Sequence, residues 1–185
     1  ATHDIKRDIN AHPHLSNDRT FSIVHNGIIE NYAELKASLM KLGYTFYSQT
    51  DTEVVANLIE HHYRAMGVGV FEAIEKTISE LRGTYGLVVQ STHEPAKLFC
   101  VRNGSPLLVG QNEDRVIVTS EQSGFCNMIS NYITLRTDDI CVITRSPEAI
   151  SVSTSHTYTK KNVNVVATDL TPAPYPHWTL KEINE

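Results

Sequence analysis

Residues 21–31 read Phe-Ser-Ile-Val-His-Asn-Gly-Ile-Ile-Glu-Asn, and the interpretation of the first half of the chain depends on this stretch. Residues 21–25 are apolar and β-branched, which predicts a short strand, and the Asn26-Gly27 pair that follows is a strong turn signal. Beyond the turn, apolar residues recur at the spacing of one helical face, at Ile28, Tyr32, Leu35, Leu39 and Leu42. The stretch therefore predicts a strand, a turn and a helix in succession.

Two further helices are predicted between residues 50 and 83. Thr50 and Glu53 have the spacing of a capping box, with Thr50 at the N-cap. A short strand is expected just before them, at residues 44–48. Apolar residues then recur at helical spacing over residues 54–66 and again over residues 71–81.

The second half of the chain is predicted to consist mostly of strands. Short apolar and β-branched runs are separated by turn residues, and these runs lie at residues 85–91, 97–102, 107–110, 116–119, 140–144 and 150–153. A short helix is expected within residues 120–129. Helices that come early and strands that come late are typical of an α+β fold rather than of alternating βαβ units.

The composition of the 185 residues fits one folded domain. Hydrophobic residues make up 41% and charged residues 20%, so the chain has enough apolar material to bury a core. The net charge of −5 argues weakly against a nucleic-acid-binding surface. No apolar run approaches the roughly 18 residues that a membrane-spanning helix needs. Cys100, Cys126 and Cys141 are too few for a disulfide scaffold, and they fit a reducing cytoplasm as small buried hydrophobic residues.

Two short motifs carry candidate chemistry, and each also has a structural interpretation. Asn26-Gly27 fits a turn, but an asparagine amide beside a glycine N–H also fits an oxyanion hole, in which two donors stabilise a developing negative charge. Asp51 fits the first turn of a helix, where the helix dipole favours an acid. Its carboxylate would equally suit the ammonium group of a substrate.

The first sixteen residues form a polar segment with several candidate residues. Thr2, His3 and His12 fit a solvated loop as well as a binding loop. His12 and His14 offer two imidazoles, but no third ligand lies at metal-binding spacing, so no metal site is predicted. At the other end of the chain the composition changes after residue 154. Residues 1–154 are therefore assigned to the domain and residues 155–185 to an extended, proline-containing connector.

Seven literal strings of the sequence occur together, in this order, in one known family. They are Ala1-Thr-His, Asn10-Ala-His-Pro-His14, Val24-His-Asn-Gly-Ile-Ile-Glu-Asn31, Gly43-Tyr-Thr-Phe46, Thr50-Asp-Thr-Glu-Val54, Leu81-Arg-Gly-Thr-Tyr-Gly86 and Arg102-Asn-Gly-Ser-Pro-Leu107. Together they closely resemble the class II glutamine amidotransferase domain, or glutaminase domain, of glucosamine-6-phosphate synthases. Residues 177–185 resemble the junction between that domain and the family's sugar isomerase domain.

The resemblance implies a fold, a reaction and partners. The fold is the four-layer αββα N-terminal-nucleophile hydrolase fold. The activity is hydrolysis of glutamine, whose ammonia passes to a sugar isomerase domain that binds fructose 6-phosphate and makes glucosamine 6-phosphate. The family needs no metal or cofactor for this half-reaction and is usually a cytoplasmic homodimer, without nucleic acid or membrane partners.

The resemblance also implies roles for single residues. Asn26 and Gly27 match the oxyanion hole, and Asp51 matches the residue that holds the glutamine α-amino group. Thr2 and His3 match the loop that closes over glutamine. His12 matches a histidine near the same pocket.

Two departures from the family pattern affect the expected activity. The family nucleophile is an N-terminal cysteine, whereas this sequence starts at Ala1, and the arginine-tryptophan pair that precedes Ala-Thr-His in the family is also absent. We therefore expect the first strands of the fold to be missing and these 185 residues to be inactive alone. A non-catalytic, amidotransferase-like module that binds an amino acid or a partner remains the alternative interpretation.

Overall fold

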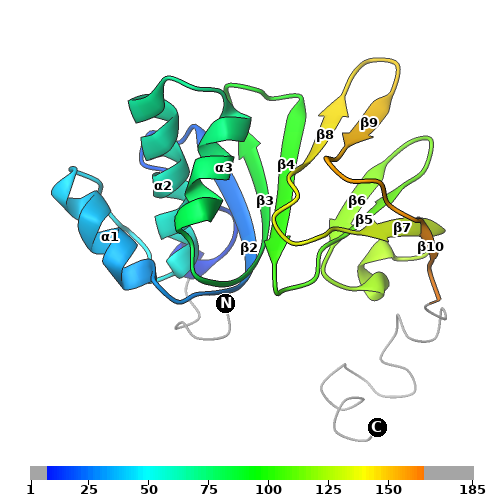
Figure 1. The fold of residues 1–185 in the computed structure, drawn as a ribbon, viewed down its shortest axis with the longest axis horizontal. Coiled ribbons are helices and arrows are strands. Elements are labelled where there is room, and N and C mark those ends of the chain that lie inside the picture. The colour runs from blue at the N-terminus through cyan, green and yellow to red at the C-terminus, as the bar shows by residue number, and fades with distance from the viewer. Residues whose placement is uncertain (1–7, 165–185) are drawn as a thin grey trace, which may run out of the picture.

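The centre of the structure is an antiparallel pair of long strands, β2 (Phe21–Ile29) and β3 (Gly83–Ser91). The computed structural model describes residues 8–164, shown in colour in Figure 1. All nine residues of β2 pair with β3, from Phe21 opposite Ser91 to Ile29 opposite Gly83. A one-turn helix, η1 (Asp8–Asn10), precedes these strands.

Four more strands complete the larger sheet. β1 (His14–Leu15) pairs with one edge of β2, while β4 (Lys97–Asn103), β8 (Cys141–Arg145) and β9 (Ile150–Ser153) extend the sheet beyond β3. The strand order is β1-β2-β3-β4-β8-β9, and every pairing is antiparallel. Among residues 8–164, strand pairing therefore covers this edge of β2 only where the two residues of β1 lie.

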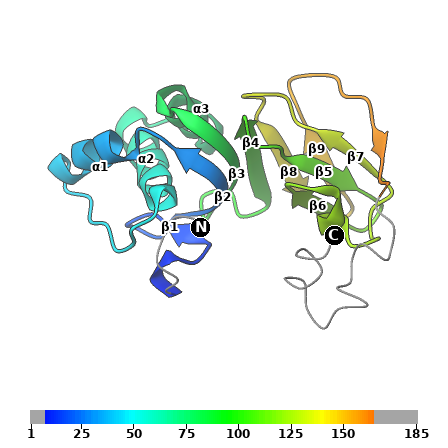
Figure 2. The same cartoon turned by 90° about the horizontal axis from the view of Figure 1, so that it is seen from below.

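A smaller antiparallel sheet follows β4 in the chain. It consists of β5 (Leu108–Gln111), β6 (Val116–Thr119), β7 (Asn131–Thr134) and β10 (Lys161–Asn162), in the order β10-β7-β5-β6. The one-turn helix η2 (Gln122–Phe125) packs beside β6. Figure 2 shows β5, β6 and β7 at one end of the molecule and the α-helices at the other.

The main core lies between the larger sheet and its helices. α2 (Asp51–Met66) and α3 (Val70–Glu80) cover the face of β2 and β3, and α1 (Tyr32–Lys41) lies outside α2 (Figure 1). Fully buried side chains from both layers fill this core, among them Phe21, Ile23, Ile29, Val55, Ile59, Ile74, Leu87, Val89 and Phe99. Within residues 8–164, no helix combines the length and apolar character that crossing a membrane requires.

The α+β class, with helices early and strands late, is confirmed. Both helices expected after residue 50 are present, and all six strands expected after residue 84 are found with ends shifted by at most two residues. β1, β7 and β10 are short strands that the sequence analysis missed, because runs of two to four residues carry little periodic signal.

The predicted turn at Asn26-Gly27 is wrong. Both residues lie inside β2, opposite Gly86 and Tyr85 of β3, and the helix begins only at Tyr32. Pairing with β3 continues through this point because Gly27 adopts φ +126°, a conformation that costs glycine little. A long-range partner thus prevails over a local turn signal.

The predicted strand at residues 44–48 and the predicted capping box are also wrong. Thr45 exchanges two hydrogen bonds of 2.7 Å with the side chain of Asn17 instead of joining a sheet. Glu53 accepts from the backbone N–H groups of Tyr47 and Ser48 at 2.9 and 2.7 Å. Thr50 is the N-cap of α2 but makes no side-chain cap hydrogen bond. The buried carboxylate of Glu53 thus satisfies backbone donors of the loop that precedes the helix.

The described part of the C-terminal segment packs on the domain. Tyr158 donates a hydrogen bond to the Asp139 carboxylate and accepts one from Arg136 N–H at 3.0 Å. Lys161 and Asn162 of β10 pair with β7. The chain therefore continues to contact the smaller sheet to the end of the described residues.

Candidate functional site

The first residue of α2 places a carboxylate against the edge of β2. Asp51 Oδ2 accepts a hydrogen bond of 2.8 Å from the backbone N–H of Ile29. The Asp51 side chain is 22% exposed, so part of the carboxylate still faces solvent. Its position at the helix N-terminus also favours the negative charge. The sequence analysis placed Asp51 at the start of a helix, and this is confirmed.

A buried histidine lies behind this carboxylate. His25 is on the helix-facing side of β2, and its Nδ1 lies 3.0 Å from Thr52 Oγ1 and 3.7 Å from Asp51 Oδ1. Burial by itself would raise the pKa of Asp51. The His25 imidazole and the Ile29 N–H stabilise the ionised form more strongly, and the pKa of Asp51 is lowered. Asp51 is therefore a carboxylate at neutral pH.

The backbone N–H of Gly27 points to the same edge of β2 as the backbone N–H of Ile29, which donates to Asp51. Glu30 N–H donates to Arg82 O at 2.9 Å on the β3 side, whereas Ile29 N–H turns away from β3. Backbone groups of a strand alternate in direction from one residue to the next. Gly27, two residues before Ile29, therefore presents its N–H at the edge. Among the described residues, β1 covers this edge no further than Ile23.

Only glycine fits at position 27. A Cβ built there would lie 2.2 Å from the carbonyl oxygen of Thr84 and 2.9 Å from Ser105 Oγ. Such distances are far below van der Waals contact, and the positive φ adds backbone strain for any other residue. The position that matches the oxyanion hole is thus one where the backbone must stay bare.

Asn26 is placed on the opposite face of the strand. Its side chain is exposed, on the same face as the half-exposed Val24 and Ile28, while Asp51 approaches from the helix side. The structure therefore brings Gly27 and Asp51 to one edge and places the Asn26 side chain on the other face of the strand. None of these contacts tests the catalytic assignment of Asn26, which stays a prediction.

The two histidines of the N-terminal segment flank the same region. His14 Nε2 lies 3.2 Å from the hydroxyl of Thr50, and the rings of His12 and His14 are 5.1 Å apart and nearly perpendicular. The pKa of His12 is lowered, first by burial and then by the neighbouring His14 and His25, with Asp51 opposing the shift. His12 is therefore mainly neutral at pH 7 and within electrostatic range of the carboxylate.

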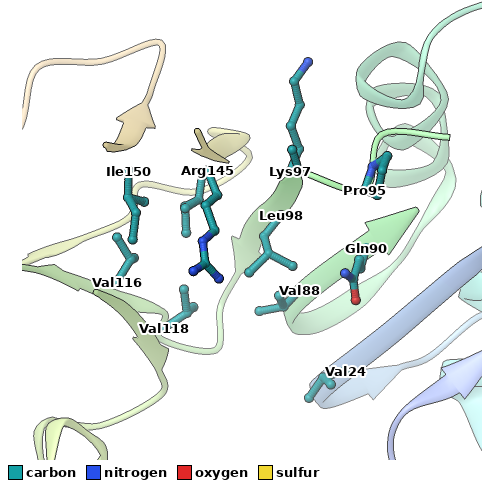
Figure 3. A pocket seen from close by; sticks show the side chains of 12 residues that line it. Val24, Val88, Gln90, Pro95, Lys97, Leu98, Val116, Val118, Arg145 and Ile150 are labelled. Atoms are coloured by element: carbon teal, nitrogen blue, oxygen red, sulfur yellow. The ribbon is translucent and has the colours of Figure 1, made fainter. Parts of the chain in front are cut away.

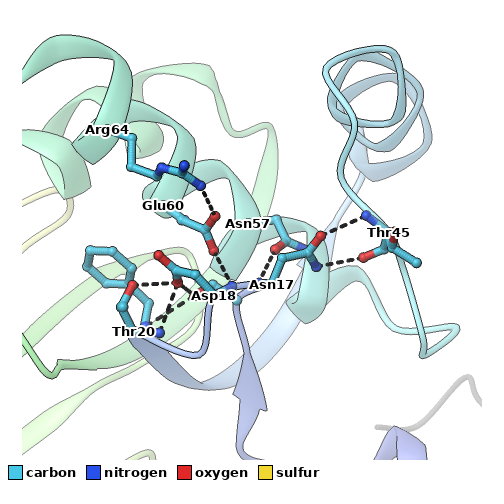
Figure 4. A network of polar contacts seen from close by, with 9 residues as sticks. Asn17, Asp18, Thr20, Thr45, Asn57, Glu60 and Arg64 are labelled. Atoms are coloured by element: carbon cyan, nitrogen blue, oxygen red, sulfur yellow. Dashed lines mark hydrogen bonds and ion pairs between the residues drawn. The ribbon is translucent and has the colours of Figure 1, made fainter.

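A polar network fixes the turn between β1 and β2 onto α2 (Figure 4). Asn17 N–H donates to Asn57 Oδ1 at 2.8 Å, and Asp18 N–H donates to Glu60 Oε2 at 2.9 Å. Glu60 is only 1% exposed and also accepts from Arg64 at 3.2 Å. Charge-assisted bonds to a buried carboxylate are stronger than neutral ones. They keep β2 in a fixed relation to the helix that carries Asp51.

A separate hollow lies on the face of the larger sheet that the helices leave open. It has a volume of about 690 Å³, and Val24, Val88, Leu98, Val116 and Val118 form much of its wall (Figure 3). Its polar lining residues are Gln90, Lys97 and Arg145, without a carboxylate, histidine or cysteine. The Asp51 carboxylate and the histidines of the candidate site therefore lie at the β2 edge and not in this hollow.

Several residues of the site escaped the sequence analysis, while others lie outside the described residues. His25 was treated only as the last residue of a predicted strand and given no role, although it continues the buried alternation of Phe21 and Ile23. A histidine on an inward-facing strand position was the available signal. No sequence signal pointed to Thr52 or to the backbone N–H of Ile29 as part of the site. Thr2 and His3 fall within residues 1–7 and have no described position.

The cysteines differ from one another in burial. Cys100 and Cys141 are buried as expected, but Cys126 is exposed, so that expectation was wrong for Cys126. Cys126 follows η2 with φ +49°, in a tight turn that leaves its side chain outside. Burial raises the pKa of the Cys100 thiol strongly and that of Cys141 to about 12. Neither buried thiol is suited to act as a nucleophile.

Comparison with known proteins decides the family. Residues 2–127 match the family described as glutamine amidotransferase domain. The chain belongs to the glutamine amidotransferase domain family. The match includes β2, α2 and the segment that carries His12 and His14, so the whole candidate site falls inside the amidotransferase domain.

Relatives of the amidotransferase domain are longer proteins. The chain is 38% identical to the glutamine–fructose-6-phosphate aminotransferase (isomerizing) of Clostridium acetobutylicum over 188 aligned residues, which cover 100% of this chain and 30% of that protein. The protein of the same name from Thermococcus kodakarensis is also 38% identical, with 100% and 31% covered. The chain thus spans about three tenths of the length of these relatives.

Solved structures confirm the fold of the amidotransferase domain. The glutamine phosphoribosylpyrophosphate amidotransferase of B. subtilis has a TM-score of 0.64 at 24% identity, over 78% of this chain and 32% of that chain. A structure described as the allosteric regulatory enzyme of purine biosynthesis has a TM-score of 0.63, also at 24% identity, over 78% and 31%. The fold is therefore that of the N-terminal-nucleophile hydrolases.

Proposed function

We propose that this amidotransferase domain is the glutaminase part of a glutamine–fructose-6-phosphate aminotransferase. Water and glutamine yield glutamate and ammonia, and the ammonia aminates fructose 6-phosphate in a sugar isomerase domain of the same protein. The names of the relatives and their full coverage of this chain support the proposal.

The observation that carries the proposal is the pairing of Asp51 with the open edge of β2. One oxygen of the carboxylate is bound to Ile29 N–H, and the Gly27 N–H lies two residues along the same edge. That separation is about 7 Å at the rise of an antiparallel strand. The α-nitrogen and side-chain amide carbon of glutamine are separated by four single bonds, about 5 Å when extended. An ammonium group on Asp51 would leave the amide end beside Gly27.

In this proposal each residue has one task. Asp51 binds the α-ammonium group of glutamine, and the Gly27 N–H together with the Asn26 side-chain amide stabilises the oxyanion that forms on the attacked carbonyl. His12 lies beside the bound amino acid. Thr2 and His3 are assigned to the loop that closes over glutamine.

The nucleophile of the reaction does not come from the three cysteines of this chain. Cys100 and Cys141 are buried in the larger sheet, and Cys126 follows η2 beside the smaller sheet. In the family that the chain resembles, the nucleophile is an N-terminal cysteine, whose free amine acts as the base.

The rest of the parent protein belongs to the same proposal. Residues 155–185 would connect residues 1–154 to the sugar isomerase domain, and the parent would be a cytoplasmic homodimer. Amino sugar synthesis needs no metal or cofactor in the glutaminase half-reaction.

The test uses the full-length protein with fructose 6-phosphate and either glutamine or an ammonium salt. Asp51→Asn should lose glutamine-dependent formation of glucosamine 6-phosphate but keep ammonium-dependent formation, because Asp51 does not touch the sugar phosphate. Equal activity of wild type and variant with glutamine would contradict the proposal. So would a wild-type protein that binds glutamine without releasing glutamate, which would support a non-catalytic module.

A further inference from the structure

The imidazole of His25 closes the buried side of the Asp51 carboxylate. The His25 side chain is 2% exposed, against 22% for Asp51, so the carboxylate lies between solvent and the imidazole. His25 Nδ1 makes a hydrogen bond of 3.0 Å with Thr52 Oγ1. At 3.7 Å, its approach to Asp51 Oδ1 is an electrostatic contact.

The contacts of His25 favour a hydrogen on Nδ1. A bare Nδ1 would direct its lone pair at a carboxylate oxygen, whereas Nδ1–H donates to Thr52 and turns the positive end of its N–H dipole toward Asp51. Nε2 is buried, without a hydrogen-bond partner among residues 8–164. The geometry therefore places a hydrogen on Nδ1, the ring nitrogen that faces both Thr52 and Asp51.

The two oxygens of Asp51 are thus held from different sides. Ile29 N–H binds Oδ2 at 2.8 Å, and the His25 ring faces Oδ1. A carboxylate accepts at about four lone-pair sites, so the solvent-facing sites stay open for an incoming cation. Fixing both oxygens before binding avoids ordering the carboxylate during binding.

We propose that His25 is a positioning residue for substrate recognition: through its Thr52-anchored Nδ1–H it holds the Asp51 carboxylate in the orientation that accepts the ammonium group of the amino acid substrate. The proposal rests on the proposed function. His25 does not contact the substrate, so it acts on binding of the ammonium group and not on the amide chemistry.

A histidine that merely fills space would behave differently. Its removal would lower stability or kcat, and any apolar or polar residue of similar size would replace it. A positioning histidine needs a donor at the place of Nδ1. Asparagine supplies one there, whereas the longer glutamine side chain carries its donor nearer the place of Nε2.

The experiment measures kcat and KM for glutamine hydrolysis by the full-length protein and its variants His25→Ala, His25→Asn and His25→Gln. His62→Ala is the matched control, because His62, on α2, is likewise a buried histidine and lies 3.2 Å from the carboxylate of Glu80. His25→Ala should raise KM about tenfold, with kcat within about threefold of wild type. His25→Asn should recover most of the loss and His25→Gln little, while His62→Ala leaves KM within about twofold.

A double-mutant cycle with Asp51→Asn separates positioning from packing. Once the carboxylate is gone, His25→Ala should change kcat/KM by less than about twofold. The proposal is overturned if KM of His25→Ala stays within twofold of wild type, or if His25→Ala lowers kcat/KM equally in wild type and in the Asp51→Asn variant. It is also overturned if His25→Asn restores KM no better than His25→Gln. If His25→Ala does not fold, the asparagine and glutamine variants decide.

Direct binding distinguishes failure of this proposal from failure of the proposed function. The Kd for glutamate, which has the same α-ammonium group but no amide to hydrolyse, is measured by calorimetry on wild type, His25→Asn and His25→Gln and does not depend on turnover. A protein that binds glutamine without hydrolysing it contradicts the glutaminase assignment, and the ratio of Kd values still tests His25. A protein that does neither contradicts both.

Discussion

Gly27→Ala should destabilise the domain more than any ordinary surface change, because two independent penalties meet at this position. The backbone has φ +126°, and a Cβ would lie 2.2 Å from the carbonyl oxygen and 2.8 Å from the carbonyl carbon of Thr84. That obstacle is the backbone of the paired strand, which cannot rotate away as a side chain can. Relief requires β2 and β3 to separate locally.

Two other glycines divide the penalty into its parts. Gly43 has φ +94° with nothing within 4 Å of its Cβ position, so Gly43→Ala reports backbone strain alone, about 1–2 kcal/mol. Gly83 has φ +114° and a Cβ position 2.2 Å from Ile28 O in the same strand pair. Gly27→Ala and Gly83→Ala should therefore each cost about 3–4 kcal/mol.

Thermal and urea unfolding of the purified domain or its parent measure these differences. A loss of 3–4 kcal/mol corresponds to a fall in Tm of roughly 6–16 °C for a domain of this size. Gly43→Ala should lower Tm much less. A Gly27→Ala variant as stable as Gly43→Ala would refute the reasoning, because the clash with Thr84 would then be absent in solution.

Three further predictions concern buried groups. Glu53→Gln should cost about 2–3 kcal/mol in urea unfolding, because the neutral amide replaces a buried carboxylate that accepts from two backbone N–H groups and a serine hydroxyl; an unchanged midpoint would contradict this. Burial raises the pKa of Glu60, so its contribution to stability is present below its unfolded pKa, near 4.3, and is lost as pH rises through the folded value. The free energy of unfolding of Glu60→Gln should consequently rise relative to that of wild type between pH 4 and pH 7. A difference between the two proteins that does not change with pH would contradict this prediction. Under native conditions, iodoacetamide should label Cys126 rapidly but Cys100 and Cys141 only after unfolding, as mapped by mass spectrometry; early labelling of either buried thiol would show that the larger sheet opens.

The sequence predicted the parts of the fold that depend on local patterns. The helices after residue 50 were found from their apolar stripes, and β6 and β9 were placed with their observed ends. These elements bury one face each, so hydrophobic periodicity reports them directly. The Ser48-Glu53 contact replaced the capping box because a buried carboxylate satisfied several loop donors at once.

Features that depend on partners distant in the chain were not predictable in this way. Asn26-Gly27 has the local signature of a turn, but Gly86 and Tyr85 of β3 hold both residues in a strand. Nothing near Thr45 in the sequence indicates that the Asn17 side chain will take its backbone hydrogen bonds.

The candidate site shows the same division. Asp51 was placed correctly at a helix start because that position has a local cause. Its bond to Ile29 N–H and its contact with His25 depend on how α2 packs across β2, which no local pattern encodes. The motifs left the roles of Asn26, Gly27 and Asp51 as one of two interpretations, which the resemblance to a family favoured, and these roles remain predictions.

Steady-state hydrolysis of glutamine by Asn26→Ala and Asp51→Ala in the full-length protein tests the central claim most directly. An oxyanion donor acts mainly in the transition state, so Asn26→Ala should lower kcat by roughly 10²–10³-fold with a small change in KM. Asp51→Ala should raise KM by at least about 30-fold, because the substrate ammonium group loses a charged partner worth about 2 kcal/mol or more. Near-normal kcat and KM in both variants would contradict the assignment of this site.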